Sequence, residues 1–139
     1  DPYQWQVENT VDHLVRKLSI TNLNYILSYQ SRVGPLKWIG PSTETVIKEE
    51  AKKHKIIIVV PVAFVSEHSE TLVELDIEYK KLAVENGSKD YVRVPAVTVN
   101  EDFINSLKSS ILSAGSGNPF TSSIKCPDKF KKCPRFQNL

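Results

Sequence analysis

The sequence predicts an α/β protein in three layers, with helices on both faces of a parallel sheet, followed by an irregular tail. Helical and strand-like patterns alternate along the chain, as expected for a parallel sheet with right-handed crossovers. The apolar run K-I-I-I-V-V-P (Lys55–Pro61) contains no alternation with polar residues, which is typical of a strand buried on both faces. Polar, glycine-rich sequence begins at Ala114, so we predict a domain at 1–113 and a linker with a basic, cysteine-containing tail at 114–139.

Length and composition indicate one soluble globular domain. The chain has 139 residues, of which 40% are hydrophobic and 24% charged, and a formal net charge of +2. Residues 114–139 carry +4 and the rest −2, which suits a solvated tail, an anionic membrane surface or a protein partner. We expect no nucleic-acid partner. No apolar run reaches the roughly 18 residues of a spanning helix, and the chain starts at Asp1 without Met, which suggests a fragment or a processed product.

The first third of the chain predicts a helix, a strand and a loop. Apolar residues over Tyr3–Leu18 recur at helical spacing, which indicates an amphipathic helix. Tyr25–Ser31 is aromatic and β-branched enough for a strand. Two Gly-Pro pairs interrupt Arg32–Pro41, so this stretch is expected to be a loop.

Five further elements follow, each marked by a capping, breaking or apolar signal. They are a helix from Ser42 or Thr43 to Lys53, the strand within Lys55–Pro61, a helix ending near Asn86, a strand at Tyr91–Pro95, and a helix from Asn100 or Glu101 to Ser113.

The most unusual segment is S-E-H-S-E-T-L-V-E-L-D-I-E-Y (Ser66–Tyr79). At helical spacing four glutamates fall in one narrow arc. They are Glu67, Glu70, Glu74 and Glu78. Such a row is mutually repulsive, and beside a cleft it raises the pKa of its members or creates a demand for a cation. A buried strand precedes it, and ligands bind at the carboxyl ends of parallel strands. Proton uptake or metal delivery fits this pattern, and so does a solvated acidic face on an ordinary helix.

Two segments resemble the ferrochelatase family. The run P-V-A-F-V-S-E-H-S-E-T-L-V-E-L-D-I-E-Y is similar to its signature P-I-A-F-x-S-D-H-x-E-T-L-Y-E-L-D-x-E-Y, and Y-Q-S-R-V-G-P-L-K-W-I-G-P-S-T extends the likeness upstream. The resemblance reaches from Asp1 to about Leu112 and covers the carboxyl-terminal part of such an enzyme. It implies one of two chelatase-like, Rossmann-like domains. Ferrochelatases are lyases that insert ferrous iron into protoporphyrin IX, the last step of haem biosynthesis.

The resemblance also implies roles for the acidic segment. Glu70 matches the family's essential glutamate, His68 the histidine of the motif, and Glu74 a second acidic residue on the same helix, so these three are the predicted catalytic residues. Glu70, Glu74 and Glu67 are the predicted metal contacts. A widened, irregular helical turn is expected in this segment, as in the family.

The predicted substrate contacts lie in the loop before the second helix. Trp38 follows the end of a predicted strand, where an aromatic ring can stack on a flat ligand or simply pack. The resemblance places its loop at the porphyrin cleft. Gln30, Ser31 and Arg32 are weaker candidates for the same cleft, and Arg32 fits either a propionate or solvent.

The tail resembles the carboxyl-terminal extension that holds a [2Fe-2S] cluster in many animal ferrochelatases. Such a cluster needs four ligands, and this tail has Cys126 and Cys133 alone. We therefore predict no cluster and no resident cofactor, with the two cysteines as a relic and Fe²⁺ as substrate. The last helix carries Ser109 where the family often has an acidic residue.

The resemblance implies the partners and the location. It predicts protoporphyrin IX and ferrous iron as substrates, a homodimer, and peripheral attachment to the matrix side of the mitochondrial inner membrane. Two hypotheses follow. The chain is part of an active ferrochelatase and inactive by itself, or it is a truncated, inactive homologue that binds porphyrin or a protein partner.

Overall fold

The computed structural model describes residues 1–31, 35, 38–54, 56–116 and 127–131. The chain forms two compact units, one made of Asp1–Gln6 with Val97–Leu139 and the other of Val7–Ala96. Within the described residues, no helix is both long enough and apolar enough to cross a membrane. The predicted boundary between residues 113 and 114 stays a prediction.

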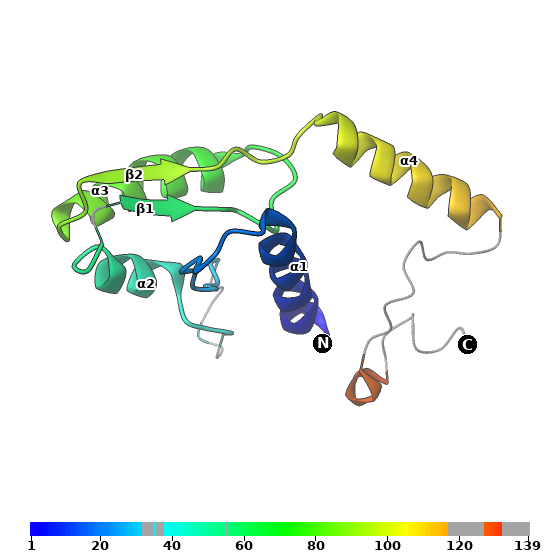
Figure 1. The fold of residues 1–139 in the computed structure, drawn as a ribbon, viewed down its shortest axis with the longest axis horizontal. Helices are drawn as coiled ribbons and strands as arrows, with labels where there is room; N and C mark the ends of the chain where they lie inside the picture. The colour runs from blue at the N-terminus through cyan, green and yellow to red at the C-terminus, as the bar shows by residue number, and fades with distance from the viewer. Residues whose placement is uncertain (32–34, 36–37, 55, 117–126, 132–139) are drawn as a thin grey trace. The chain divides into compact units, whose positions relative to one another are not determined.

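The described elements are six helical segments that precede, separate and follow two strands. In chain order they are α1 (Tyr3–Leu18), α2 (Thr43–Glu50), β1 (Ile56–Val59), the π-helix η1 (Glu70–Glu78), α3 (Tyr79–Glu85), β2 (Asp90–Arg93), α4 (Glu101–Gly115) and the 3₁₀ turn η2 (Asp128–Phe130). β1 and β2 pair in parallel, with Ile57 opposite Tyr91 and Val59 opposite Arg93 (Figure 1). This order and the parallel pairing confirm the predicted α/β class.

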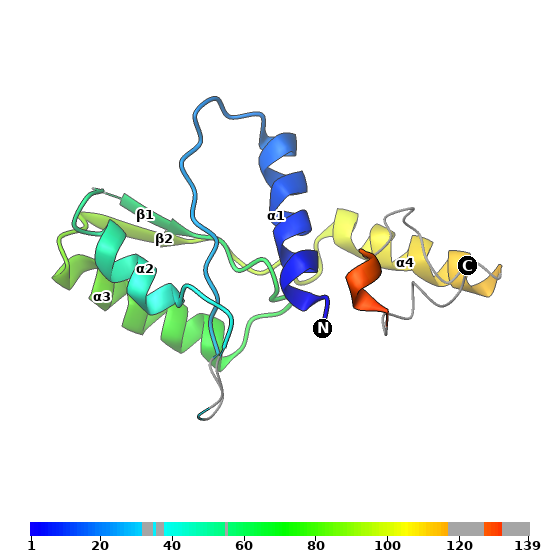
Figure 2. The ribbon, with the colours of Figure 1, turned by 90° about the horizontal axis from the view of Figure 1, so that it is seen from below.

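The core of the unit Val7–Ala96 lies between the sheet and three helical segments. Ile47 of α2, Leu75 of η1, Ala83 of α3 and Tyr91 of β2 are buried together, with Ile57 of β1 packed against them. Figure 2 shows α2 and α3 on the same side of the two strands. The opposite face is open in the described part of this unit: Ile56 and Ile58 are 56% and 65% exposed. The sequence predicted burial of this strand on both faces, and within this unit only one is covered.

The predicted strand at Tyr25–Ser31 is wrong except at one residue. Tyr29 forms an isolated parallel bridge with Ser42, made by its N–H to the Pro41 carbonyl at 2.9 Å and by the Thr43 N–H to its carbonyl at 3.1 Å. The ladder ends there because α2 begins at Thr43 and Pro41 has no N–H to donate.

Capping contacts explain where α2 begins and where α3 ends. Ser42 caps α2 by accepting from the Thr45 N–H at 3.2 Å, as the sequence predicted. α3 ends at the predicted Asn86, where Gly87 takes a positive φ of 107° and the Ser88 N–H donates to the Ala83 carbonyl at 3.0 Å. This is a Schellman-type stop, in which glycine tolerates the left-handed backbone.

In the other unit, η2 of the predicted tail lies near Trp5 of α1. The Phe130 ring of η2 lies 6.4 Å from the Trp5 ring, and the Lys129 ammonium lies 5.0 Å from the Phe130 centroid. α4 begins after the Asn100 cap, as predicted. The Asn100 side chain accepts from the Asp102 and Phe103 N–H groups.

Candidate active site

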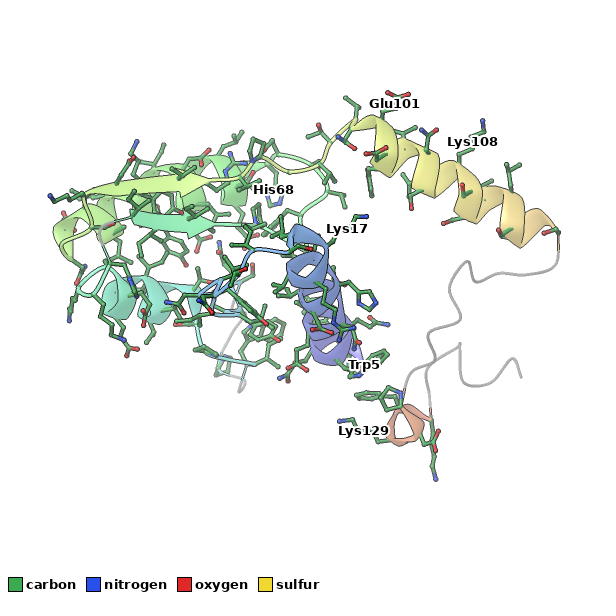
Figure 3. The ribbon with its side chains drawn as sticks, viewed as in Figure 1. Trp5, Lys17, His68, Glu101, Lys108 and Lys129 are labelled. Carbon is green, nitrogen blue, oxygen red and sulfur yellow. The ribbon has the colours of Figure 1, made fainter. Side chains whose placement is uncertain are left out.

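The acidic segment forms a π-helix over its whole length from Glu70 to Glu78. Its last ring is closed by the Tyr79 N–H, which donates to the Glu74 carbonyl five residues earlier. This confirms the predicted widening and extends it beyond one turn. Such i→i+5 geometry is rare and occurs often at functional sites. Residue 68 lies in the connection between β1 and η1, close to the carboxyl ends of both strands (Figure 3).

Along the widened helix, buried residues and glutamates recur at the same interval. Thr71, Leu75 and Tyr79 follow one another at intervals of four and are at most 9% exposed. Each is preceded by a glutamate, so the glutamates line the edge of the buried face. These residues, Glu70, Glu74 and Glu78, are named the open carboxylates below. They form no ion pair with any described Lys, Arg or His.

The other two acidic residues near the helix share one arginine. Arg93, at the end of β2, donates through Nε and Nη2 to both Asp76 oxygens at 2.8 and 2.5 Å, and through Nη1 to Glu67 Oε1 at 2.6 Å. The Ala96 N–H also donates to Glu67 Oε1, at 2.9 Å. Only 8% of the Arg93 side chain is exposed. Glu67 and Asp76 are named the paired carboxylates.

These contacts shift the titration of the paired carboxylates. The Thr71 hydroxyl, the Arg93 guanidinium and the Ala96 amide together lower the pKa of Glu67 to about 2. The two Arg93 hydrogen bonds lower the pKa of Asp76 as well. Both groups are therefore charged at neutral pH, and the single Arg93 charge between them neutralises one of their two negative charges.

Glu70 and His68 are held by the turn and loop around them. The Ser31 hydroxyl donates to Glu70 Oε1, joining the predicted substrate loop to the predicted catalytic residue. The Glu70 N–H donates to His68 Nδ1 at 3.2 Å, so a neutral His68 ring carries its proton on Nε2. The His68 ring packs on Phe64 with centroids 4.9 Å apart.

Glu74 faces an open pocket of about 270 Å³. The pocket is lined by Glu44, Glu74, Glu78, Tyr79 and Leu82. The Tyr79 hydroxyl donates to Glu74 Oε1 at 3.1 Å, and burial together with this carboxylate raises the pKa of the phenol. Tyr79 therefore remains a donor at any physiological pH. Three carboxylates from two helices give this pocket a negative lining.

The structure also ties the predicted substrate contacts together. The Trp38 indole N–H donates to the Gln30 carbonyl at 3.0 Å, which leaves the ring 44% exposed. Gln30 lies directly before Ser31, so Trp38 and Glu70 are linked through two adjacent residues of the same loop. An exposed, tethered indole of this kind can stack on a planar ligand.

Other predicted site residues are not brought together. Arg32, Cys126 and Cys133 lie outside the described residues. No three His, Cys, Asp or Glu side chains in the described ranges gather closely enough to hold a metal ion. Glu67 Oε1 accepts a hydrogen bond from Arg93, which indicates a structural role for this carboxylate. Metal contact by Glu67, Glu70 and Glu74 stays a prediction.

Sequence reasoning missed Arg93 and Tyr79. Arg93 is a lone basic residue in a strand, and its carboxylate partners lie 17 and 26 positions earlier, so no local spacing signals the contact. Tyr79 was visible as an apolar position of the helical stripe, but its hydroxyl reaches Glu74 five residues back, which only the widened helix allows.

The fold and site define the class of protein: an α/β chelatase-type domain with an acidic π-helix beyond the carboxyl ends of parallel strands. The family model Ferrochelatase matches residues 1–114. Over 138 residues the chain is 60% identical to the ferrochelatase of Pelagibacter ubique, covering 96% of this chain and 40% of that protein. It is 47% identical over 139 residues to that of Rickettsia prowazekii, with the same coverage, and 48% identical over 151 residues to that of Rickettsia bellii, covering 100% and 41%. The chain belongs to the ferrochelatase family.

The relatives also correct the predicted location. They are bacterial ferrochelatases, so the mitochondrial inner membrane, which was inferred from the animal-type tail, is wrong. The chain spans about 40% of the length of these curated relatives.

Proposed function

We propose that this chain supplies the acidic helix of a ferrochelatase that inserts Fe²⁺ into protoporphyrin IX. The observation that carries the proposal is the row of open carboxylates, which no described cation neutralises, beside the exposed Trp38 indole. Metallation releases two pyrrole protons as the metal binds four nitrogens. A site for this reaction needs negative groups that attract the cation and accept protons, next to a surface for a flat ring.

In this proposal Glu70 is the group closest to the macrocycle. Its oxygen is fixed by the Ser31 hydroxyl, and a fixed carboxylate is a better proton acceptor for an oriented substrate than a freely rotating one. His68 has Nδ1 occupied by the Glu70 amide, so its Nε2 proton is free to be donated. Glu74 and Glu78 extend the negative row along the helix toward Glu44, which suits the approach of a hydrated Fe²⁺ ion.

Porphyrin binding is assigned to the loop that carries Gln30, Ser31 and Trp38. The indole tether to the Gln30 carbonyl supports this, because it holds the ring outward without burying it. A homodimer and peripheral membrane association rest on the family resemblance alone and stay predictions. The lack of a [2Fe-2S] cluster rests on the number of cysteines, two where four ligands are needed, and also stays a prediction.

The test is a chimera in which residues 1–139 replace the matching segment of the Pelagibacter ubique ferrochelatase. We expect it to convert protoporphyrin IX to haem at a rate comparable with the parent, measured by loss of porphyrin fluorescence under anaerobic Fe²⁺. The matched control is the parent enzyme carrying its own segment. We expect the 139-residue chain alone to insert no metal.

A chimera that folds and binds porphyrin but inserts no iron would contradict the proposal and favour the inactive homologue. Iron or zinc insertion by the chain alone would instead overturn its expected dependence on the rest of the enzyme.

A further inference from the structure

The structure assigns Arg93 as a positioning residue of this site, which rests on the function proposed above. Arg93 fixes the π-helix and the turn before it, and through them the places of His68 and Glu70. It does so by binding one carboxylate on each side of the catalytic candidates, Glu67 before them and Asp76 after them.

The location of Arg93 favours this role. It is the last residue of β2 and lies opposite Val59, the last residue of β1, and the next N–H, of Val94, donates to the Val59 carbonyl at 2.9 Å, so the Arg93 side chain starts from hydrogen-bonded backbone. Because 8% of that side chain is exposed, the guanidinium has little surface with which to touch a substrate. Its three nitrogens are all engaged with Asp76, Glu67 or the Val94 carbonyl.

A continuous set of contacts leads from Arg93 to the catalytic candidates. Glu67, bound by Arg93 and by the Ala96 amide, is the neighbour of His68. The His68 N–H donates to Thr71 Oγ1 at 2.9 Å, and that hydroxyl donates to the His68 carbonyl at 3.0 Å. The Thr71 side chain is fully buried, so this turn has little room to shift.

The helix itself gives a reason for such a clamp. A π-helix has less favourable geometry than an α-helix and is normally seen as a single turn, whereas η1 runs for nine residues. Asp76 lies in its last turn, and the bidentate bond from Arg93 fixes both the position and the plane of that carboxylate. The open carboxylates lie on the same helix, so a bond that fixes the helix also fixes their positions.

Substitution of Arg93 separates positioning from simple stabilisation. In the chimera we expect Arg93→Lys to lower kcat per folded enzyme by about 10-fold and Arg93→Met by about 100-fold, since small misplacements of a reacting group have effects of this size. The KM for porphyrin should change by less than about 2-fold, because Arg93 does not touch the ring. Lysine keeps the charge but cannot bind two carboxylates as a planar fork does. The matched control is Lys81→Met, which breaks the exposed Lys81–Glu85 pair.

A second measurement does not depend on activity. In the 139-residue chain, amide hydrogen exchange of residues 68–78 should accelerate in Arg93→Lys, while the amides of α2 keep their wild-type rates. If Arg93→Met does not fold, kcat and hydrogen exchange are measured in Arg93→Lys and Asp76→Asn instead.

Wild-type kcat in Arg93→Lys, or exchange that rises equally in α2 and η1, would overturn the assignment and leave Arg93 as an ordinary stabilising ion pair. An inactive parent chimera would refute the proposed function, while the exchange measurement would still decide whether Arg93 holds the helix.

Discussion

The paired and the open carboxylates occupy the same short stretch of chain and differ in what faces them. The paired ones share a nearly buried guanidinium, and Glu67 also accepts from a backbone amide. Among the described residues, the open ones have hydroxyl donors, Ser31 for Glu70 and Tyr79 for Glu74, and no cation. A hydroxyl orients a carboxylate without neutralising it.

The paired carboxylates therefore use their charge to bind Arg93, whereas the charge of the open carboxylates is not neutralised by any described residue. An arginine placed on the open row would neutralise the negative charge that, in the proposed function, attracts the metal ion. Arg93 instead binds Glu67 and Asp76, so it fixes the backbone before and within η1 and leaves the negative charge of the open carboxylates in place. The two sets should therefore respond differently to substitution and to pH.

The largest effect is expected at Glu70. Glu70→Gln in the chimera should reduce kcat by about 10² to 10⁴-fold, the range for loss of a general base, because glutamine retains the acceptor oxygen for Ser31 but takes up no proton. The melting temperature should stay close to wild type. Glu85→Gln, an exposed carboxylate on α3, is the matched control. An equal loss in both variants would mean that the open row has no special role.

The paired carboxylates should reveal themselves through acid stability. The pKa of Glu67 is lowered from 4.5 to about 2. The ionised Glu67 therefore stabilises the fold fully above pH 4.5, and this stabilisation is lost as the pH falls toward 2. Glu67→Gln should therefore lower the melting temperature at pH 6 and weaken its further decline below pH 4.5. Thermal denaturation in the 139-residue chain between pH 6 and 3 measures this.

Glu78→Gln is the comparison from the open row. It should shift the melting temperature by less than about 3 °C at pH 6, as for other exposed substitutions of this kind. A steep acid dependence that survives in Glu67→Gln and disappears in Glu78→Gln would reverse the assignment of the two sets.

Much of the fold was predictable because its signals are local. The periodicity of Tyr3–Leu18 predicted α1 at its observed bounds, and the caps at Ser42 and Asn100 marked the starts of α2 and α4. The predicted strand at Tyr25–Ser31 failed for a non-local reason. Its composition suits a strand, but its only described pairing partner turns into a helix after one bridge.

The site divides in the same way. The acidic row could be found from spacing, and the widened helix from family resemblance, because both are properties of one continuous segment. The separation of Glu67 from the row could not, since it depends on Arg93 from β2 and on the Ala96 amide, both distant in sequence. At ideal α-helical spacing Glu67 belongs with the other glutamates, but in the structure it lies in the connection before η1, where Arg93 and the Ala96 amide bind it.

A smaller effect is expected from the hydroxyl that orients Glu70. Ser31→Ala should lower kcat by about 10-fold, because Glu70 keeps its charge but loses its described tether. Stability should change little, since Ser31 is exposed. Steady-state kinetics of the chimera, with Ser113→Ala as a matched serine substitution on α4, checks this. A loss as large as that of Glu70→Gln would mean that Ser31 does more in the reaction than orient Glu70.

The smallest effect is expected from Tyr79→Phe. The ring stays in the core while the 3.1 Å hydrogen bond to Glu74 is lost. Glu74 faces an open pocket, so water replaces the phenol as its donor and its charge is unchanged. We expect kcat to be nearly unaltered and the KM for Fe²⁺ to change by about 2-fold, in contrast to the large loss in Glu70→Gln. If Tyr79→Phe instead abolished iron insertion without unfolding the chimera, orientation of Glu74 would matter as much as its charge. Hydroxyl and guanidinium partners would then both position the site, and the distinction between the two sets would rest on charge balance alone.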